Sequence, residues 1–85
     1  MFDSRGVEVV YRLWNGRMGP ERDDIWVETG GGAYYVAIRE GGRQEPRRRW
    51  GPYDRDAAWR WVQHLVATSG QPADEWIALT DLQAG

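Results

Sequence analysis

The sequence predicts a small α+β domain in which an antiparallel meander sheet of three to four strands packs on one long helix. Residues 7–40 contain stretches that alternate with the period of two typical of strands, whereas residues 54–69 repeat apolar side chains at helical spacing. Glycine and proline separate these stretches. A chain of 85 residues, with 41% hydrophobic and 28% charged residues, is enough for one domain spanning residues 1–85 and too short for two.

Residues 7–14 form the first predicted strand. Alternation divides its side chains between two faces, with Val7, Val9, Tyr11 and Leu13 on the buried face and Glu8, Val10, Arg12 and Trp14 on the other. Asn15–Gly16 and Gly19–Pro20 then break the pattern. The charged residues 21–24 are predicted to form a solvated loop.

Residues 25–29 and 33–40 are the second and third predicted strands, and the glycines 30–32 between them predict a hairpin. On the third strand, the buried face takes the even-numbered residues Tyr34, Val36 and Ile38. Residues 47–51 are a short, strongly basic candidate for a fourth strand, with a proline at either end where it does not disturb the ladder.

Residues 54–69 carry the signals of a long helix. Asp54 can cap its first turn, and Gly70 follows its last turn, where a positive φ is needed. Its apolar side chains form one stripe, which is Ala58, Trp61, Val62, Leu65 and Val66. We expect this stripe to pack on the sheet.

Two structures are open for the end of the chain. Pro72 at a first helical position, with two acids behind it, predicts a short second helix that runs to about Leu82. This helix would turn three apolar side chains inward, namely Trp76, Leu79 and Leu82. A terminal strand at residues 76–79 is the alternative.

The residue types that catalysis requires are scarce. The chain has no cysteine and one histidine, His64, which lies at the margin of the helical stripe and is interpreted as a packing residue. Neither Ser4 nor Ser69 lies on a strand-to-helix elbow that would display a nucleophile. The carboxylate pairs suit loop or first-turn charges, and no spacing predicts metal ligands. We therefore predict a protein that is not an enzyme and uses no metal and no cofactor.

No membrane segment or disulfide is predicted. No apolar run approaches the roughly 20 residues that span a bilayer, and the first residues lack the order of a signal peptide. A cytoplasmic protein without membrane contact is expected.

Six tryptophans and four tyrosines make the chain rich in aromatic residues. With the strand faces assigned as above, the opposite side of the sheet displays Arg12, Trp14, Trp26, Tyr35 and Arg39, with Glu8 and Glu28 among them. Aromatics beside arginine are typical of interfaces. The leading hypothesis is a small recognition or adaptor module that binds a protein partner, or a second copy in a homodimer, through this face.

Charge is distributed unevenly along the chain. The net charge is −2, yet residues 39–60 contain seven arginines and four acids. The alternative hypothesis is nucleic-acid binding through this basic patch, by Arg39, Arg43, Arg47, Arg48, Arg49 and Trp50. A simpler interpretation has Arg47 and Arg49 on one side and Arg48 on the other, balanced by Glu40, Glu45 and Asp54.

Three segments give a partial family resemblance. Residues 33–39, Arg49-Trp50-Gly51-Pro52-Tyr53-Asp54 and Ala57-Ala58-Trp59 are similar in order to the plant APETALA2-type DNA-binding domain and to the arm-binding domain of phage integrases. The resemblance covers residues 25–69. It implies a three-stranded sheet packed on one helix, with the outer sheet face in the major groove and Trp26, Arg39 and Arg48 as contact residues. The chain departs from this pattern in its net negative charge and in Glu28 and Glu40 near that face.

Overall fold

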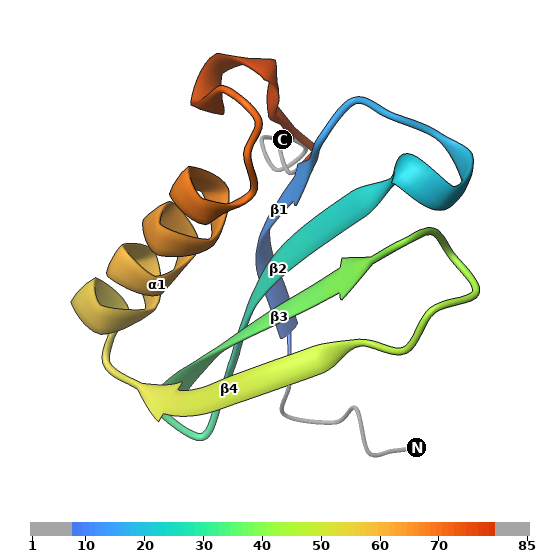
Figure 1. Ribbon diagram of the computed structural model, residues 1–85. Helices are drawn as coiled ribbons and strands as arrows, with labels where there is room; N and C mark the ends of the chain where they lie inside the picture. The colour runs from blue at the N-terminus through green and yellow to red at the C-terminus, as the bar shows by residue number, and fades with distance from the viewer. Residues whose placement is uncertain (1–7, 80–85) are drawn as a thin grey trace.

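The computed structural model describes residues 8–79, and it has the predicted α+β architecture: an antiparallel sheet with one long helix packed on it (Figure 1). The elements in chain order are β1 (Glu8–Trp14), the 3₁₀ turn η1 (Gly19–Glu21), β2 (Asp23–Gly30), β3 (Ala33–Glu40), β4 (Arg48–Tyr53), α1 (Arg55–Thr68), the 3₁₀ turn η2 (Ala73–Glu75) and β5 (Ile77–Ala78). The sheet has five strands in the order β4-β3-β2-β1-β5. The first four therefore form a meander, and β5 extends the sheet beside β1.

The hairpin of β2 and β3 forms where the glycines predicted it. Gly30 pairs with Ala33, so only Gly31 and Gly32 make the turn. Their φ angles are 62° and 84°, and a turn with two positive φ values matches the right-handed twist of the flanking strands. The predicted even-numbered face of β3 is also confirmed, because Val36 and Ile38 are buried in the core.

The alternation predicted for β1 is wrong at its beginning. The register with β2 shifts between Val9 and Tyr11, which is a β-bulge. Val9 consequently pairs with Glu28 on the side away from the helix, whereas Val10 lines a hollow with Trp59 on the helix side. Tyr11 and Leu13 do face the core, as predicted. Val7 lies outside the described residues.

Strand β4 is longer at its end than predicted. It covers Arg48–Tyr53, so Pro52 lies inside the strand, and the bond from Gly51 to Pro52 is cis. Gly51 has φ 139° and lies against β3: a Cβ there would be 2.6 Å from the ring of Tyr35 and 2.9 Å from the Tyr34 carbonyl oxygen. Glycine is therefore required where β4 crosses this part of β3.

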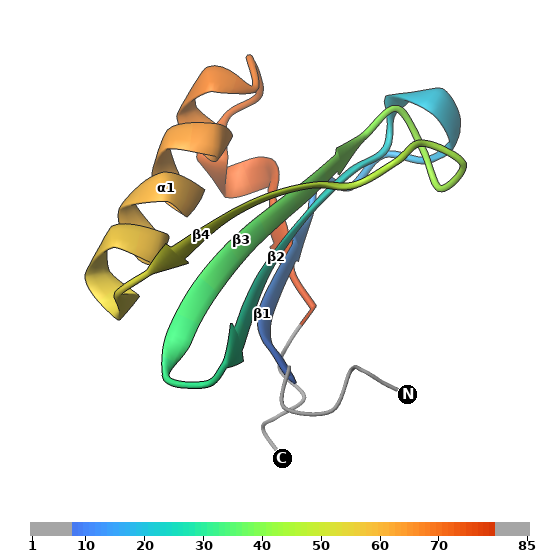
Figure 2. The same cartoon turned by 90° about the horizontal axis from the view of Figure 1, so that it is seen from below.

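The boundaries and the buried stripe predicted for the long helix are confirmed in α1. The Asp54 carboxylate accepts a hydrogen bond of 2.8 Å from the backbone N–H of Ala57, and Gly70 beyond the helix has φ 83°. Three residues of the stripe, Ala58, Val62 and Val66, are buried, while Trp61 and Leu65 are half-buried against the core. Figure 2 shows α1 on one side of the twisted sheet, with no α-helix on the other side among the described residues.

The chain after α1 follows the strand alternative. The expected second helix is reduced to η2, because the chain extends again at Trp76 and enters β5, which pairs with the end of β1. Trp76 is buried as predicted, but Leu79 is exposed. Leu82 lies outside the described residues.

Within residues 8–79, no helix has the length and apolar character required to cross a membrane.

Candidate binding face of the sheet

The face of the sheet that α1 leaves open holds all five residues of the leading hypothesis. We call it the arginine face and define it by the side chains of Arg12, Trp14, Arg22, Asp24, Trp26, Glu28, Tyr35, Arg39, Arg47 and Arg49. Directly paired residues of neighbouring strands share one face of a sheet. Trp26 pairs with Arg12, and Glu28 pairs with Tyr35, so these four side chains lie on the same face of the sheet.

Trp26 lies at the centre of this face beneath three arginines. The guanidinium carbons of Arg47, Arg39 and Arg12 lie 4.8, 5.2 and 5.3 Å from its ring centroid. A guanidinium over an aromatic face gains cation–π attraction and covers the ring. Trp26 is only 6% exposed as a result, so the expectation that the sheet displays this ring to solvent is wrong.

Asp24 is the buried anion at one end of the face. Its carboxylate is fully buried and accepts hydrogen bonds from Arg22 at 2.9 and 3.1 Å and from Arg12 at 3.1 Å, with Arg39 at 3.7 Å. Burial alone would raise the pKa of Asp24, but the hydrogen bonds from Arg22 and Arg12 outweigh it and hold that pKa below its usual value. The prediction of a solvated loop at residues 21–24 is wrong here, because β2 begins at Asp23.

Glu28 is the second buried anion, at the other side of Trp26. It is 4% exposed, and its two carboxylate oxygens lie 2.8 Å from the Arg47 guanidinium and 3.2 Å from that of Arg49. Arg49 also stacks on the ring of Tyr35, 4.2 Å from its centroid. The carboxylate and the rings together hold both guanidinium groups in fixed positions at the surface.

Trp14 stands at the margin of the face and is half-buried. Arg22 lies 5.3 Å from its ring centroid, and its indole N–H donates a 2.8 Å hydrogen bond to the Arg17 carbonyl oxygen. Trp14 thus joins the sheet to the loop between β1 and β2. Asn15 anchors that loop: its side chain accepts from the backbone N–H of Asp23 at 3.0 Å and donates to the Glu21 carbonyl oxygen at 2.9 Å.

Positive charge exceeds negative charge on this face. Among residues 8–79, this face has the two carboxylates of Asp24 and Glu28. They are already outnumbered by four of its arginines, namely Arg22, Arg39, Arg47 and Arg49, although the whole chain has a net charge of −2. Arg47 and Arg49 reach furthest into solvent, with 42% and 44% of their side chains exposed. Since a guanidinium has five N–H donors, both arginines retain donors after binding Glu28.

The second predicted set of residues is divided between different parts of the molecule. Arg39, Arg47 and Arg49 belong to the arginine face. Arg48 and Trp50 lie on the helix side: Arg48 pairs with Glu40 at 2.7 Å, and Trp50 packs edge-on against the ring of Trp61. Arg43 lies apart in the loop between β3 and β4. The six residues therefore do not form one patch.

The charge balance that the sequence suggested for this region is confirmed only for Arg48. Its partner is Glu40, as expected, but Arg47 and Arg49 share the one carboxylate of Glu28 from β2 rather than pairing with Glu45 or Asp54. Glu28 lies two strands away from β4, so contacts within one hairpin could not identify it.

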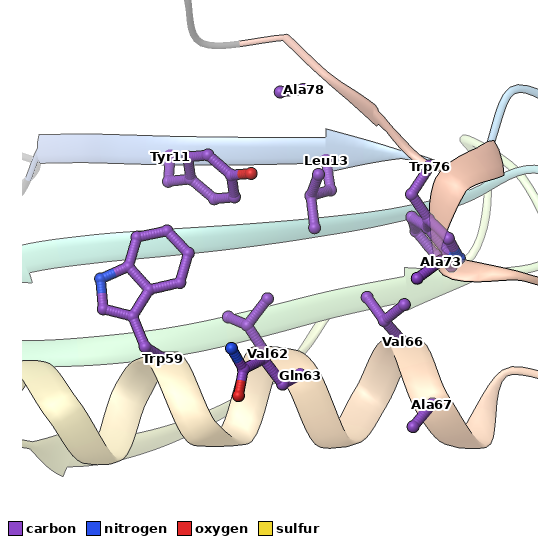
Figure 3. Close-up of a pocket in the computed structure, with 10 residues that line it drawn as sticks. All are labelled: Tyr11, Leu13, Trp59, Val62, Gln63, Val66, Ala67, Ala73, Trp76 and Ala78. Carbon is purple, nitrogen blue, oxygen red and sulfur yellow. The ribbon is translucent and has the colours of Figure 1, made fainter.

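An apolar pocket of about 390 Å³ opens between β1 and α1 on the other side of the sheet. Figure 3 shows its walls, with Tyr11 and Leu13 on β1 facing Trp59, Val62 and Val66 on the helix. The described residues that line it are Tyr11, Leu13, Trp59, Val62, Gln63, Val66, Ala67, Ala73, Trp76 and Ala78. None of these described residues is a carboxylate, an arginine or a histidine, so they offer no general base or acid near neutral pH.

His64 is exposed and stacks on the ring of Trp61, with centroids 4.9 Å apart. Ser69 donates its hydroxyl to the Val66 carbonyl oxygen at 2.7 Å and so serves the end of the helix. In the described part of the chain, no group of three or more acidic or histidine side chains could hold a metal ion.

Sequence reasoning missed the two structural roles that organise the site, which are Asp24 as a buried anion and the arginine cover on Trp26. The alternation of Asp24, Trp26 and Glu28 along one strand face was the available signal for both.

No protein-family model, curated protein or solved structure matches this chain in the comparisons with known proteins.

Proposed function

We propose that the protein is a non-catalytic recognition module that binds an acidic segment of a partner protein through the arginine face. The observation that carries this proposal is the excess of arginines over carboxylates on an open sheet face. Arg47 and Arg49 are held in place by Glu28 and by ring stacking, so less side-chain entropy is lost when they bind a ligand. A carboxylate is the anion that a guanidinium binds with two parallel hydrogen bonds.

The charge of this face favours an acidic partner over a second copy of the chain. Two arginine faces brought together would place like charges against each other, which disfavours association. The buried position of Trp26 also removes the exposed aromatic surface on which a homodimer through this face would depend. An acidic segment supplies the missing negative charge instead.

Nucleic acid is the second candidate ligand. It is favoured by the placement of Arg39, Arg47 and Arg49 together on the open face of a sheet backed by one helix. Of the three contact residues that the resemblance to APETALA2-type domains implied, Arg39 lies on this face, whereas Trp26 is buried and Arg48 lies on the helix side. The net charge of −2 weighs against it, because phosphate binding rests on long-range attraction. The protein partner therefore remains the first proposal.

Fluorescence anisotropy tests both candidates. The ligands are a labelled glutamate-rich peptide, a lysine-rich peptide of equal length and a short DNA duplex, each titrated at low and at physiological salt. We expect the acidic peptide to bind and the lysine-rich peptide not to bind. If the duplex bound more tightly than the acidic peptide, and its affinity fell steeply with salt, nucleic acid would become the proposed ligand in place of a protein partner. Absence of binding to all three would contradict the proposed function.

A pair of double variants locates the site. Arg47→Gln with Arg49→Gln removes two charges from the arginine face but leaves amide donors for Glu28. Arg55→Gln with Arg60→Gln removes two charges from exposed positions of α1. We expect the first pair to weaken peptide binding about tenfold or more and the second pair to change it less than about twofold. Equal losses would mean that net charge alone, and not this face, binds the peptide.

A further inference from the structure

Strand β4 forms an open edge of the sheet. It is the last strand in the order β4-β3-β2-β1-β5, and among residues 8–79 no strand pairs with its outer side. Figures 1 and 2 show β4 at the margin of the sheet, with α1 on one face. An edge strand presents backbone N–H and C=O groups that can pair with another extended chain.

The register of the sheet shows which of these groups point outward. Gly30 and Ala33 close a two-residue turn and form a hydrogen-bonded pair, and such pairs alternate along an antiparallel ladder. Odd-numbered residues of β3 therefore bond to β2, which the 3.1 Å bond from the Gly41 N–H to the Arg22 carbonyl confirms just beyond the strand. Ala37 is odd-numbered, so its partner Arg49 directs its own N–H and C=O away from the sheet.

Arginine side chains stand on both sides of this edge. Arg47 and Arg49 lie on the arginine face and Arg48 on the helix side. A strand added here would alternate its side chains between the same two sides. Charged residues on an edge oppose pairing with a copy of that edge, because like charges meet. A strand that carries carboxylates meets opposite charge on either side instead.

We propose that the acidic partner segment binds as an additional β-strand along the outer edge of β4, with its backbone paired at Arg49 and its carboxylates on Arg47 and Arg49. This inference rests on the proposed function and names the way in which the partner binds. Main-chain hydrogen bonds would supply affinity and the arginines would select acidic sequences. Pro52, which has no N–H, limits the added strand to the part of β4 before it.

Backbone methylation of the ligand tests this binding mode on the unaltered protein. The parent peptide alternates glutamate and valine; one derivative carries N-methyl groups on every glutamate amide and the other on every valine amide. Amides of alternate residues point to the same edge of a strand, so one derivative should bind about tenfold or more weaker and the other close to the parent. If both derivatives bind like the parent, strand addition is overturned and the arginine face stands. If the parent does not bind, the proposed function itself fails.

Two substitutions at one position give the matching test on the protein. Arg49→Ala and Arg49→Pro both lose the guanidinium, but only proline removes the outward N–H. We expect Arg49→Pro to bind the parent peptide about tenfold more weakly than Arg49→Ala, with both variants showing cooperative thermal unfolding. Equal affinity of two folded variants would overturn strand addition at this edge.

Discussion

Replacing Asp24 by Asn tests the physical basis of the arginine face. The change keeps the size of the side chain but removes the negative charge of the carboxylate, which accepts three hydrogen bonds from Arg22 and Arg12. Breaking a buried ion pair costs about 3 to 5 kcal/mol, but these arginines retain some contact with water. We therefore expect Asp24→Asn to lower the free energy of unfolding by about 2 to 3 kcal/mol at pH 7.

The pH dependence of that loss identifies its cause. The pKa of Asp24 is lower in the folded protein than its ordinary value of 3.8, so its charge stabilises the fold above that pH. The contribution is lost as pH falls through the folded-state pKa. Urea unfolding followed by tryptophan fluorescence should show the difference between wild type and Asp24→Asn narrowing as pH falls below about 3.8.

A surface ion pair provides the control for this experiment. Glu40 pairs with Arg48, and 53% and 62% of their side chains are exposed. We expect Glu40→Gln to cost less than about 1 kcal/mol at pH 7. If Asp24→Asn cost no more than Glu40→Gln, or if its cost were the same at pH 7 and at low pH, the account of Asp24 as an essential buried anion would be refuted.

Four further predictions concern the fold and its charges, each measured by urea unfolding. Asp23→Asn should stabilise the protein at pH 7, because burial and the neighbouring acids raise the pKa of Asp23; the gain should shrink as pH falls through that raised pKa and be gone below the ordinary value of 3.8. Ile25→Ala, at a fully buried position, should cost about 3 kcal/mol. Gly32→Ala should cost about 1 kcal/mol, because φ there is 84°. Asp54→Ala should remove the helix cap and cost about 1 kcal/mol. If Ile25→Ala did not lower the free energy of unfolding, the assigned core would be contradicted. If Gly32→Ala or Asp54→Ala did not lower it, the assigned turn or the assigned helix cap would be contradicted.

The sequence was sufficient for the elements that local signals determine. The hairpin glycines require positive φ, and Asp54 and Gly70 mark the ends of α1, so both elements could be placed from residue type and spacing. The bulge at Val9 and Val10 could not be placed in this way, because both residues are apolar and either fits either face. The strand β5 depends on pairing with β1, about 60 residues earlier, which local signals do not show. The same pairing extends the chain at Trp76, so the helix that Pro72 and the acids behind it predicted is limited to the turn η2.

The members of the candidate site were predicted only in part, because Arg22 and Asp24 were expected in a loop and Arg47 and Arg49 in a separate basic patch. Alternation placed Arg12, Trp26 and Arg39 on one face, which is correct. Burial of Trp26 could not be inferred, because it depends on long arginine side chains from β1, from β3 and from the residue before β4, which fold back over the ring. The absence of enzymatic activity, the cytoplasmic location and the identity of the partner stay predictions.

Titration of the ¹⁵N-labelled protein with the glutamate-rich peptide, observed at the arginine Nε–H signals, tests the central claim most directly. Binding at the arginine face should shift the signals of Arg39, Arg47 and Arg49 progressively and leave those of Arg55 and Arg60 on α1 unchanged. Shifts confined to Arg55 and Arg60, or equal shifts of all five signals, would contradict the claim that this face is the binding site.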